Sequence, residues 1–144
     1  MRKTVSPFVL AGALAIPAAF IGYGASSATA DASAESAALP ELVVVKHHAD
    51  WCGKCKTLIE PLHEVKEQLT DESVLFVTYD FSDKETAMQS EYLAGMMRLD
   101  DQWESFGKKT GFALVIDTDS MEVVETLRST DSAELVAQIR SHLD

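Results

Sequence analysis

The sequence predicts one mixed α/β domain in which helices flank a central sheet. Two short apolar runs, 42–48 and 74–79, enclose a stretch with helical periodicity, 52–69. Two later apolar runs, 112–116 and 123–127, are separated by a polar turn. A strand–helix–strand beginning implies two parallel strands, and strands joined by a polar turn imply an antiparallel hairpin. The sheet is therefore expected to be mixed.

Residues 1–30 have the pattern of a secretory signal peptide. Two basic residues precede an uncharged run from Val5 to Ala25, and the triplet at 28–30 is an A-x-A cleavage site. An uncleaved membrane anchor is the alternative, because the apolar run could nearly span a bilayer. Either reading predicts an exported protein in a periplasmic or other extracytoplasmic location.

The remainder divides into a short lead-in and one domain. Residues 31–40 are small and polar, which predicts a flexible segment, and 41–144 are long enough for one core. All 23 acidic residues but only ten of the 12 basic ones follow residue 30, giving a net charge of −13 there. Nucleic-acid binding needs clustered Lys and Arg, so this class is excluded. We expect a monomer.

The first half of the domain is expected to be strand, helix and strand. Four apolar residues open 42–48 without alternation, which predicts a buried central strand. The helix at 52–69 has Pro61 inside it, and a kink is expected there. Its apolar positions recur at three- and four-residue steps: Leu58, Ile59, Leu62, Val65 and Leu69. The run 74–79 predicts a second buried strand.

The stretch 80–111 is long, polar and rich in helix formers. Ser82 and Glu85 predict a capping box at the start of one helix, which Gly95 ends or bends. A second helix over 99–109 would place three apolar residues on one face: Leu99, Trp103 and Phe106. Met96, Met97 and Trp103 are expected to serve either as core or as a partner surface.

An amphipathic helix follows the hairpin and closes the domain. Asp131 and Glu134 have the spacing of a capping box. The apolar face comprises Leu135, Val136, Ile139 and Leu143.

The two cysteines of the chain lie together in "KHHADWCGKCK", residues 46–56. A disulfide between Cys52 and Cys55 would close a very small loop and would constrain the unfolded chain little. The pair is therefore expected to do chemistry. The positive end of the helix, with Lys54 and Lys56, favours a thiolate at Cys52. Cys55 lies on the same helical face and can attack a mixed disulfide, so Cys52 is the nucleophile and Cys55 the resolving thiol.

Two other classes of function remain open. His47 and His48 beside the cysteines allow a zinc or copper chaperone, although adjacent strand residues point to opposite faces. His63 lies about 12 Å along the helix from Cys55, too far for one metal site. A redox-inert interaction module is the third class. Redox exchange is the favoured interpretation, with His48 tuning the thiols.

The stretch "ADWCGKCK" resembles the thioredoxin active-site pattern, in which a tryptophan precedes C-G-P-C-K at the end of a central strand. The order of elements over 42–143 is similar to that family as well. The resemblance implies a thioredoxin fold with a longer helical insert before the C-terminal hairpin. It implies exchange with protein thiols or disulfides, a membrane-bound redox partner and no cofactor. The residues carried over are Trp51, Cys52, Gly53, Cys55 and Lys56.

Two departures concern lysines. Lys54 stands where the family has proline, and it is expected to favour the thiolate and a more oxidising pair. Lys46 stands where the family has a buried acid that serves proton transfer. Lys46 could serve proton transfer only if burial kept it neutral, and as a cation it would instead stabilise thiolates. Alternatively, it is a structural lysine that pairs with an acid such as Asp80 or reaches solvent. We favour the structural interpretation.

A third departure precedes the hairpin. Gly111 takes the place of the cis-proline that faces the cysteines in the family. A non-proline cis bond costs about 3–4 kcal/mol, so a trans Thr110–Gly111 bond is predicted. Glycine still permits close approach of a substrate, with which the Thr110 backbone could pair. In the family the proline helps to keep metals off the dithiol, so its absence strengthens the metal alternative.

Overall fold

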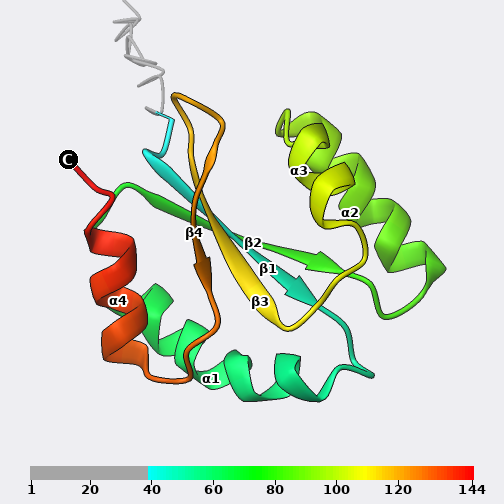
Figure 1. Cartoon of the computed structure of the whole chain (residues 1–144), viewed down its shortest axis with the longest axis horizontal. Coiled ribbons are helices and arrows are strands. Elements are labelled where there is room, and N and C mark those ends of the chain that lie inside the picture. Colours follow the sequence, from blue (N-terminus) through cyan, green and yellow to red (C-terminus); the bar gives the residue numbers. More distant parts are fainter. Residues whose placement is uncertain (1–38) are drawn as a thin grey trace, which may run out of the picture. The chain divides into compact units, whose positions relative to one another are not determined.

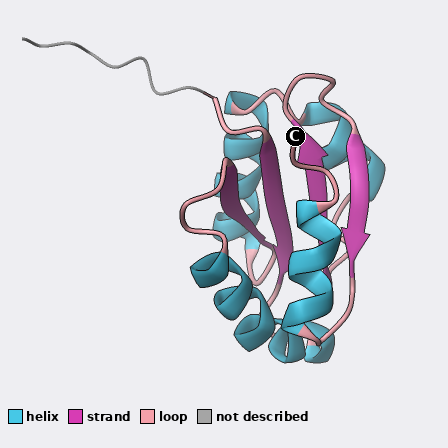
Figure 2. Ribbon diagram, turned by 90° about the vertical axis from the view of Figure 1, so that its left-hand side faces the viewer, coloured by secondary structure: helices cyan, strands magenta, loops and turns pink. Residues whose placement is uncertain are grey.

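The computed structural model describes residues 39–144, which form a mixed sheet with helices on both faces (Figures 1 and 2). The predictions for the signal peptide and for most of the lead-in fall outside these residues. In chain order the elements are β1 (Leu42–His48), α1 (Gly53–Gln68), β2 (Val74–Asp80), α2 (Lys84–Met96), α3 (Asp100–Phe106), β3 (Phe112–Asp117), β4 (Val123–Leu127) and α4 (Ser132–Arg140).

The strand order within the described residues is β2-β1-β3-β4. β1 is parallel to β2 and antiparallel to β3, and β3 and β4 form an antiparallel hairpin. The register places Lys46 beside Thr78 on one side and Ala113 on the other. The predicted fold class, including the central position of β1, is confirmed.

Side chains of β1 alternate between two cores because successive strand residues point to opposite faces. Leu42 and Val44 join the cluster under α1 and α4. Val43 and Val45 join the other cluster, which includes residues of α2 and the aromatic side chains around α3. The strand that ends at the cysteines is therefore packed on both faces, which gives the site a rigid base.

The prediction that 74–79 is a buried strand is wrong. β2 lies at the edge of the sheet, and Tyr79 is its only buried residue. Leu75 is 43% exposed. An edge strand has one neighbour instead of two, and the composition of an isolated apolar run does not reveal this difference.

Helix starts differ from the predictions in detail. α2 is capped by Asp83, whose carboxylate accepts the Glu85 and Thr86 N–H groups, and not by Ser82. The Ser82 hydroxyl is engaged elsewhere, since it accepts the Asp50 N–H at 2.9 Å and donates to the Asp80 carboxylate. A carboxylate on the next residue is then the available cap.

Other helix features agree only in part with the sequence. Asp131 caps α4 as predicted, but the Glu134 carboxylate accepts from the Ser129 hydroxyl at 2.6 Å and so does not complete the box. α1 continues through Pro61, and Ile59 is 44% exposed although it was placed on the apolar face. Within residues 39–144, no helix combines the length and apolarity needed to cross a membrane.

Candidate active site

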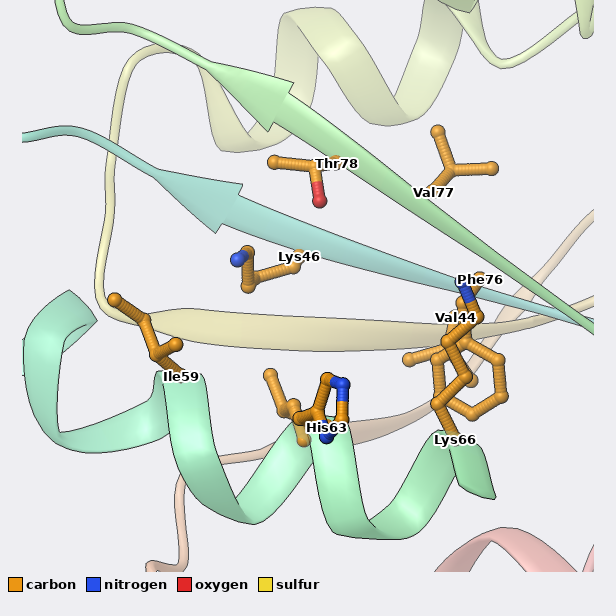
Figure 3. Close-up of a pocket in the computed structure, with 9 residues that line it drawn as sticks. Val44, Lys46, Ile59, His63, Lys66, Phe76, Val77 and Thr78 are labelled. Atoms are coloured by element: carbon orange, nitrogen blue, oxygen red, sulfur yellow. The ribbon is translucent and has the colours of Figure 1, made fainter.

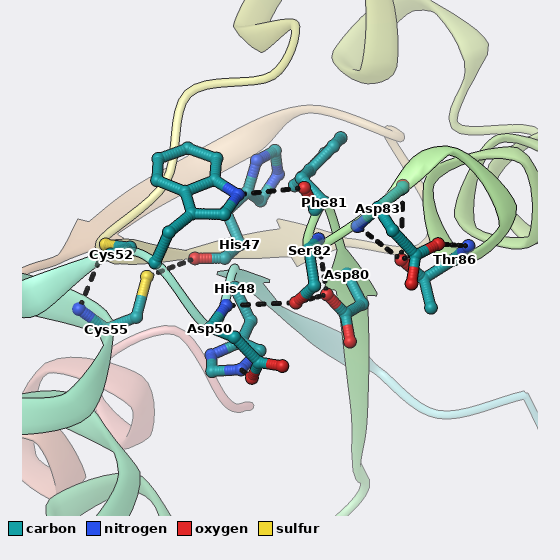
Figure 4. A network of polar contacts seen from close by, with 11 residues as sticks. His47, His48, Asp50, Cys52, Cys55, Asp80, Phe81, Ser82, Asp83 and Thr86 are labelled. Carbon is teal, nitrogen blue, oxygen red and sulfur yellow. Dashed lines mark hydrogen bonds and ion pairs between the residues drawn. The ribbon is translucent and has the colours of Figure 1, made fainter.

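The two cysteines lie at the start of α1, just after β1 (Figure 4). Cys52 is the N-cap of α1, and its Sγ accepts the N–H of Cys55 at 3.1 Å. Both thiols are free. Cys52 is 9% exposed and Cys55 only 1%. Of the two thiols, Cys52 is therefore the more accessible to another molecule.

The surroundings of Cys52 stabilise its thiolate. Burial alone would raise the pKa of the Cys52 thiol. Hydrogen bonds from the side chains of Cys55 and Thr110 and from the Cys55 and Lys54 N–H groups outweigh it, so the pKa is lowered. These donors stand at a helix N-terminus, where backbone N–H groups lack partners within the helix. Cys52 thus has the electrostatic character of a nucleophile.

Cys55 is shifted in the opposite direction. Burial raises the pKa of the Cys55 thiol, and its hydrogen bond with Cys52 and the charge of Cys52 raise it further. Its single S–H proton has two available acceptors, the Cys52 thiolate and the His47 carbonyl oxygen, which lies 3.5 Å from Cys55 Sγ. Cys55 is therefore the thiol that keeps its proton while Cys52 is ionised, which matches the roles predicted from the spacing.

A second segment, the loop before β3, closes over Cys52. Gly111 has φ of +88°, and its N–H donates to the His47 carbonyl oxygen at 3.1 Å. A Cβ at this glycine would lie 2.9 Å from Lys54 Cβ and 3.5 Å from Cys52 Sγ. The peptide bonds of residues 39–144, including Thr110–Gly111, are trans, as predicted. Glycine is thus required here both by its backbone conformation and by the proximity of Lys54.

Gly111→Ala is expected to destabilise the protein and to weaken the thiolate. Left-handed backbone costs an L-residue about 1–2 kcal/mol, and relieving the contact with Lys54 adds about 1–3 kcal/mol. Displacing Thr110 from Cys52 would also raise the thiol pKa. Urea unfolding and the pH dependence of Cys52 alkylation measure the two effects. Gly53→Ala is the matched control, because a Cβ there meets nothing within 4 Å. Equal effects of the two variants would contradict this account.

Trp51 and His48 precede the dithiol in the chain. Trp51 is 65% exposed, and its indole Nε1 donates to the Phe81 carbonyl oxygen at 3.3 Å. His48 Nε2 lies 3.3 Å from the Asp50 carboxylate. Trp51 thus presents a fixed apolar surface next to Cys52. The tuning role of His48 stays a prediction.

Lys46 lines a groove of about 200 Å³ between β1, β2 and α1, with Ile59, His63 and Lys66 along its α1 side (Figure 3). Burial alone would raise the pKa of Asp80, but hydrogen bonds from Ser82 and the charges of His48 and Lys46 lower it overall. The charge of Lys46 therefore acts on Asp80. The structural interpretation of Lys46 stays a prediction, and so does the effect of Lys54 on the redox potential.

The histidines have separate surroundings. His47 Nδ1 lies 3.0 Å from the Lys109 carbonyl oxygen, and His63 lies 3.8 Å from the Glu67 carboxylate. Within the described part of the chain, no three His, Cys, Asp or Glu side chains converge as metal ligands.

Sequence reasoning overlooked His47 as a constituent of the site. Its side chain is 1% exposed, and it contacts the loop that carries Thr110 and Gly111. One signal was available: His47 alternates with Val43 and Val45 and therefore occupies a core-facing strand position. The contact with Lys109 spans 62 residues and had no local signature.

Both the sequence and the fold are similar to those of known proteins. The thioredoxin family model matches residues 28–99, half of the chain. A thiol:disulfide interchange protein of the thioredoxin family from Chlorobium tepidum TLS is 18% identical, with a TM-score of 0.52, over 74% of this chain and 82% of that one. Oxidised thioredoxin from Plasmodium falciparum is 19% identical, with a TM-score of 0.47, over 72% and 83% of the two chains. No curated protein matches the sequence significantly.

Proposed function

Because the chain belongs to the thioredoxin family and carries a free dithiol, we propose that it is an exported thiol–disulfide oxidoreductase that acts on protein substrates. The observation that carries the proposal is the unequal placement of the two thiols at the start of α1: Cys52 Sγ accepts the Cys55 N–H at 3.1 Å and is the more exposed, whereas Cys55 is 1% exposed. The pKa of Cys52 is lowered and that of Cys55 is raised, so one thiol is ready to attack while the other holds its proton.

In the reducing direction, the Cys52 thiolate attacks one sulfur of a substrate disulfide. A Cys52–substrate disulfide forms, and the other substrate sulfur leaves as a thiolate that takes up a proton. Cys55 then loses its proton and attacks Cys52 Sγ, which releases the second substrate thiol. Two electrons pass from the dithiol to the substrate, and a Cys52–Cys55 disulfide remains. The oxidising direction is the same sequence reversed.

The proposed location rests on residues 1–30, with their basic start, uncharged run and A-x-A site. Outside the cytoplasm the dithiol would need a membrane-bound partner to restore its working redox state. N-terminal sequencing of the protein from an envelope fraction tests this, and a chain recovered from the cytoplasm with Met1 intact would contradict it.

The decisive test is reduction of insulin by the full chain, with dithiothreitol as the electron source. The rate of insulin precipitation is expected to rise with protein concentration, and protein alkylated beforehand with iodoacetamide is expected to leave it at background. No acceleration would overturn the proposal. Stoichiometric zinc or copper in protein without turnover would favour the metal chaperone instead. Equilibration with glutathione buffers then gives the reduction potential, which distinguishes reductant from oxidant.

A further inference from the structure

His47 lies in an aromatic cluster beneath the dithiol. Its ring stacks on Phe112 at a centroid distance of 4.6 Å, and Tyr79, Phe81 and Phe106 surround it at 5.5, 5.6 and 6.2 Å. The residue is 1% exposed. An apolar side chain would satisfy such a position by packing alone, so a polar ring there calls for an explanation.

The hydrogen bond of the ring defines its protonation. The Lys109 carbonyl oxygen can only accept, so His47 Nδ1 carries the proton and donates across 3.0 Å. Nε2 is buried and has no partner among the described residues. A proton on Nε2 would find no acceptor there. The geometry therefore favours one neutral tautomer.

The backbone carbonyl of His47 also forms hydrogen bonds with the loop before β3 and with the dithiol. The His47 carbonyl oxygen lies 3.5 Å from the Cys55 thiol, which can donate to it (Figure 4). It also accepts from the Gly111 N–H at 3.1 Å. The loop before β3 is thus bound to His47 at Lys109 and at Gly111. Thr110 lies between these two points, and its neighbour Gly111 is so close to the dithiol that a Cβ there would lie 3.5 Å from Cys52 Sγ. Thr110 contributes to lowering the pKa of both thiols.

We propose that His47 is a positioning residue for the dithiol: its neutral imidazole fixes the Lys109 carbonyl and so holds Thr110 against Cys52. The bond at Gly111 alone leaves the preceding residues free to rotate about a glycine, whereas two bonds fix the segment between them. The effect reaches Cys52 through Thr110, and the imidazole itself takes no part in sulfur chemistry. In function, this inference rests on the proposed dithiol exchange.

Charged and titratable groups around the ring agree with a neutral imidazole. The Arg128 guanidinium lies 5.4 Å from the Phe112 ring centroid, beyond the ring on which His47 stacks. Burial and the charge of Asp100 raise the pKa of Tyr79 to about 12, so the Tyr79 phenol is uncharged at neutral pH. Cys55 faces the backbone of His47, and Lys109 contributes its carbonyl. Within the described residues, the His47 ring forms no hydrogen bond or ion pair with a carboxylate.

Two substitutions separate the hydrogen bond from the packing. His47→Phe keeps an aromatic ring in the cluster but removes the donor to Lys109. We expect it to retain its urea midpoint while the pKa of Cys52 rises by about one unit, a roughly tenfold loss of thiolate below that pKa. His47→Asn keeps an N–H donor near the Nδ1 position but loses ring packing. We expect a lower urea midpoint with the pKa of Cys52 close to that of the unmodified protein.

The pH dependence of Cys52 alkylation supplies the thiol pKa without requiring turnover. Tyr79→Phe is the matched control, because it removes a buried hydroxyl from the same cluster without touching the loop. An unchanged Cys52 pKa in His47→Phe would overturn the proposal. The proposal would also fall if the Cys52 pKa of both variants rose in proportion to their loss of stability. A protonated Nε2 in the ¹⁵N spectrum of the unmodified protein would likewise overturn it. If insulin reduction fails while these shifts occur, the proposed function falls and the positioning role stands.

Discussion

Cys52→Ser is expected to lower the rate of insulin reduction to the uncatalysed rate. Cys55→Ser should stop the reaction after the mixed disulfide has formed. Cys52 is the more exposed thiol and has the lowered pKa, so its loss removes the attacking thiolate. Cys55 is 1% exposed and has a raised pKa, which makes it a poor attacker of an external disulfide. Without Cys55 the mixed disulfide at Cys52 has no resolving thiol and should accumulate.

Mass spectrometry under non-reducing conditions distinguishes the two variants. Cys55→Ser incubated with a disulfide-containing protein should yield a covalent adduct that dithiothreitol releases. Cys52→Ser should yield no such adduct and serves as the matched control, since it retains one thiol of the pair. Adducts on Cys52→Ser and none on Cys55→Ser would reverse the assigned roles.

The parts of the fold that the sequence predicted best have strong local signals. The bounds of β1 and β4 agree with the predicted runs, since β-branched residues without alternation mark a strand wherever it lies in the sheet. α4 was predicted from a capping aspartate followed by apolar residues at helical spacing. By contrast, the edge position of β2 depends on which other strands pair with it, and no residue of 74–80 encodes that.

The candidate site likewise combines features that neighbouring residues predict with features that depend on contacts distant in the sequence. The spacing of Cys52 and Cys55 and their place at a helix start follow from a few neighbouring residues. The lowered pKa of Cys52 depends in part on Thr110, more than fifty residues later, and the position of Thr110 depends on the loop that binds His47 at Lys109 and Gly111. Such contacts arise only when β1 and β3 are brought side by side.

His47 should also make the folded protein sensitive to acid. Burial, only partly offset by the hydrogen bond with Lys109, lowers the pKa of His47 from 6.5 to about 4. In the unfolded chain the imidazole takes up a proton as the pH falls through 6.5, while in the folded protein it stays neutral until about pH 4. The unfolded state therefore binds more protons in this window, and the free energy of unfolding falls as the pH falls. The expected loss is about 1.4 kcal/mol per pH unit, or about 3 kcal/mol across the window.

Urea unfolding at several pH values between neutrality and pH 4 measures this loss, with His47→Phe as the comparison. The variant cannot bind a proton at this position, so its stability should decline less steeply below pH 6.5. Carboxylates such as Asp80, whose pKa is lowered in the folded state, also lose their contribution as the pH falls, but they do so in both proteins. The difference between the two curves therefore isolates His47. Parallel curves would show that the folded and unfolded chains protonate His47 at the same pH, which would contradict the lowered pKa of the buried ring.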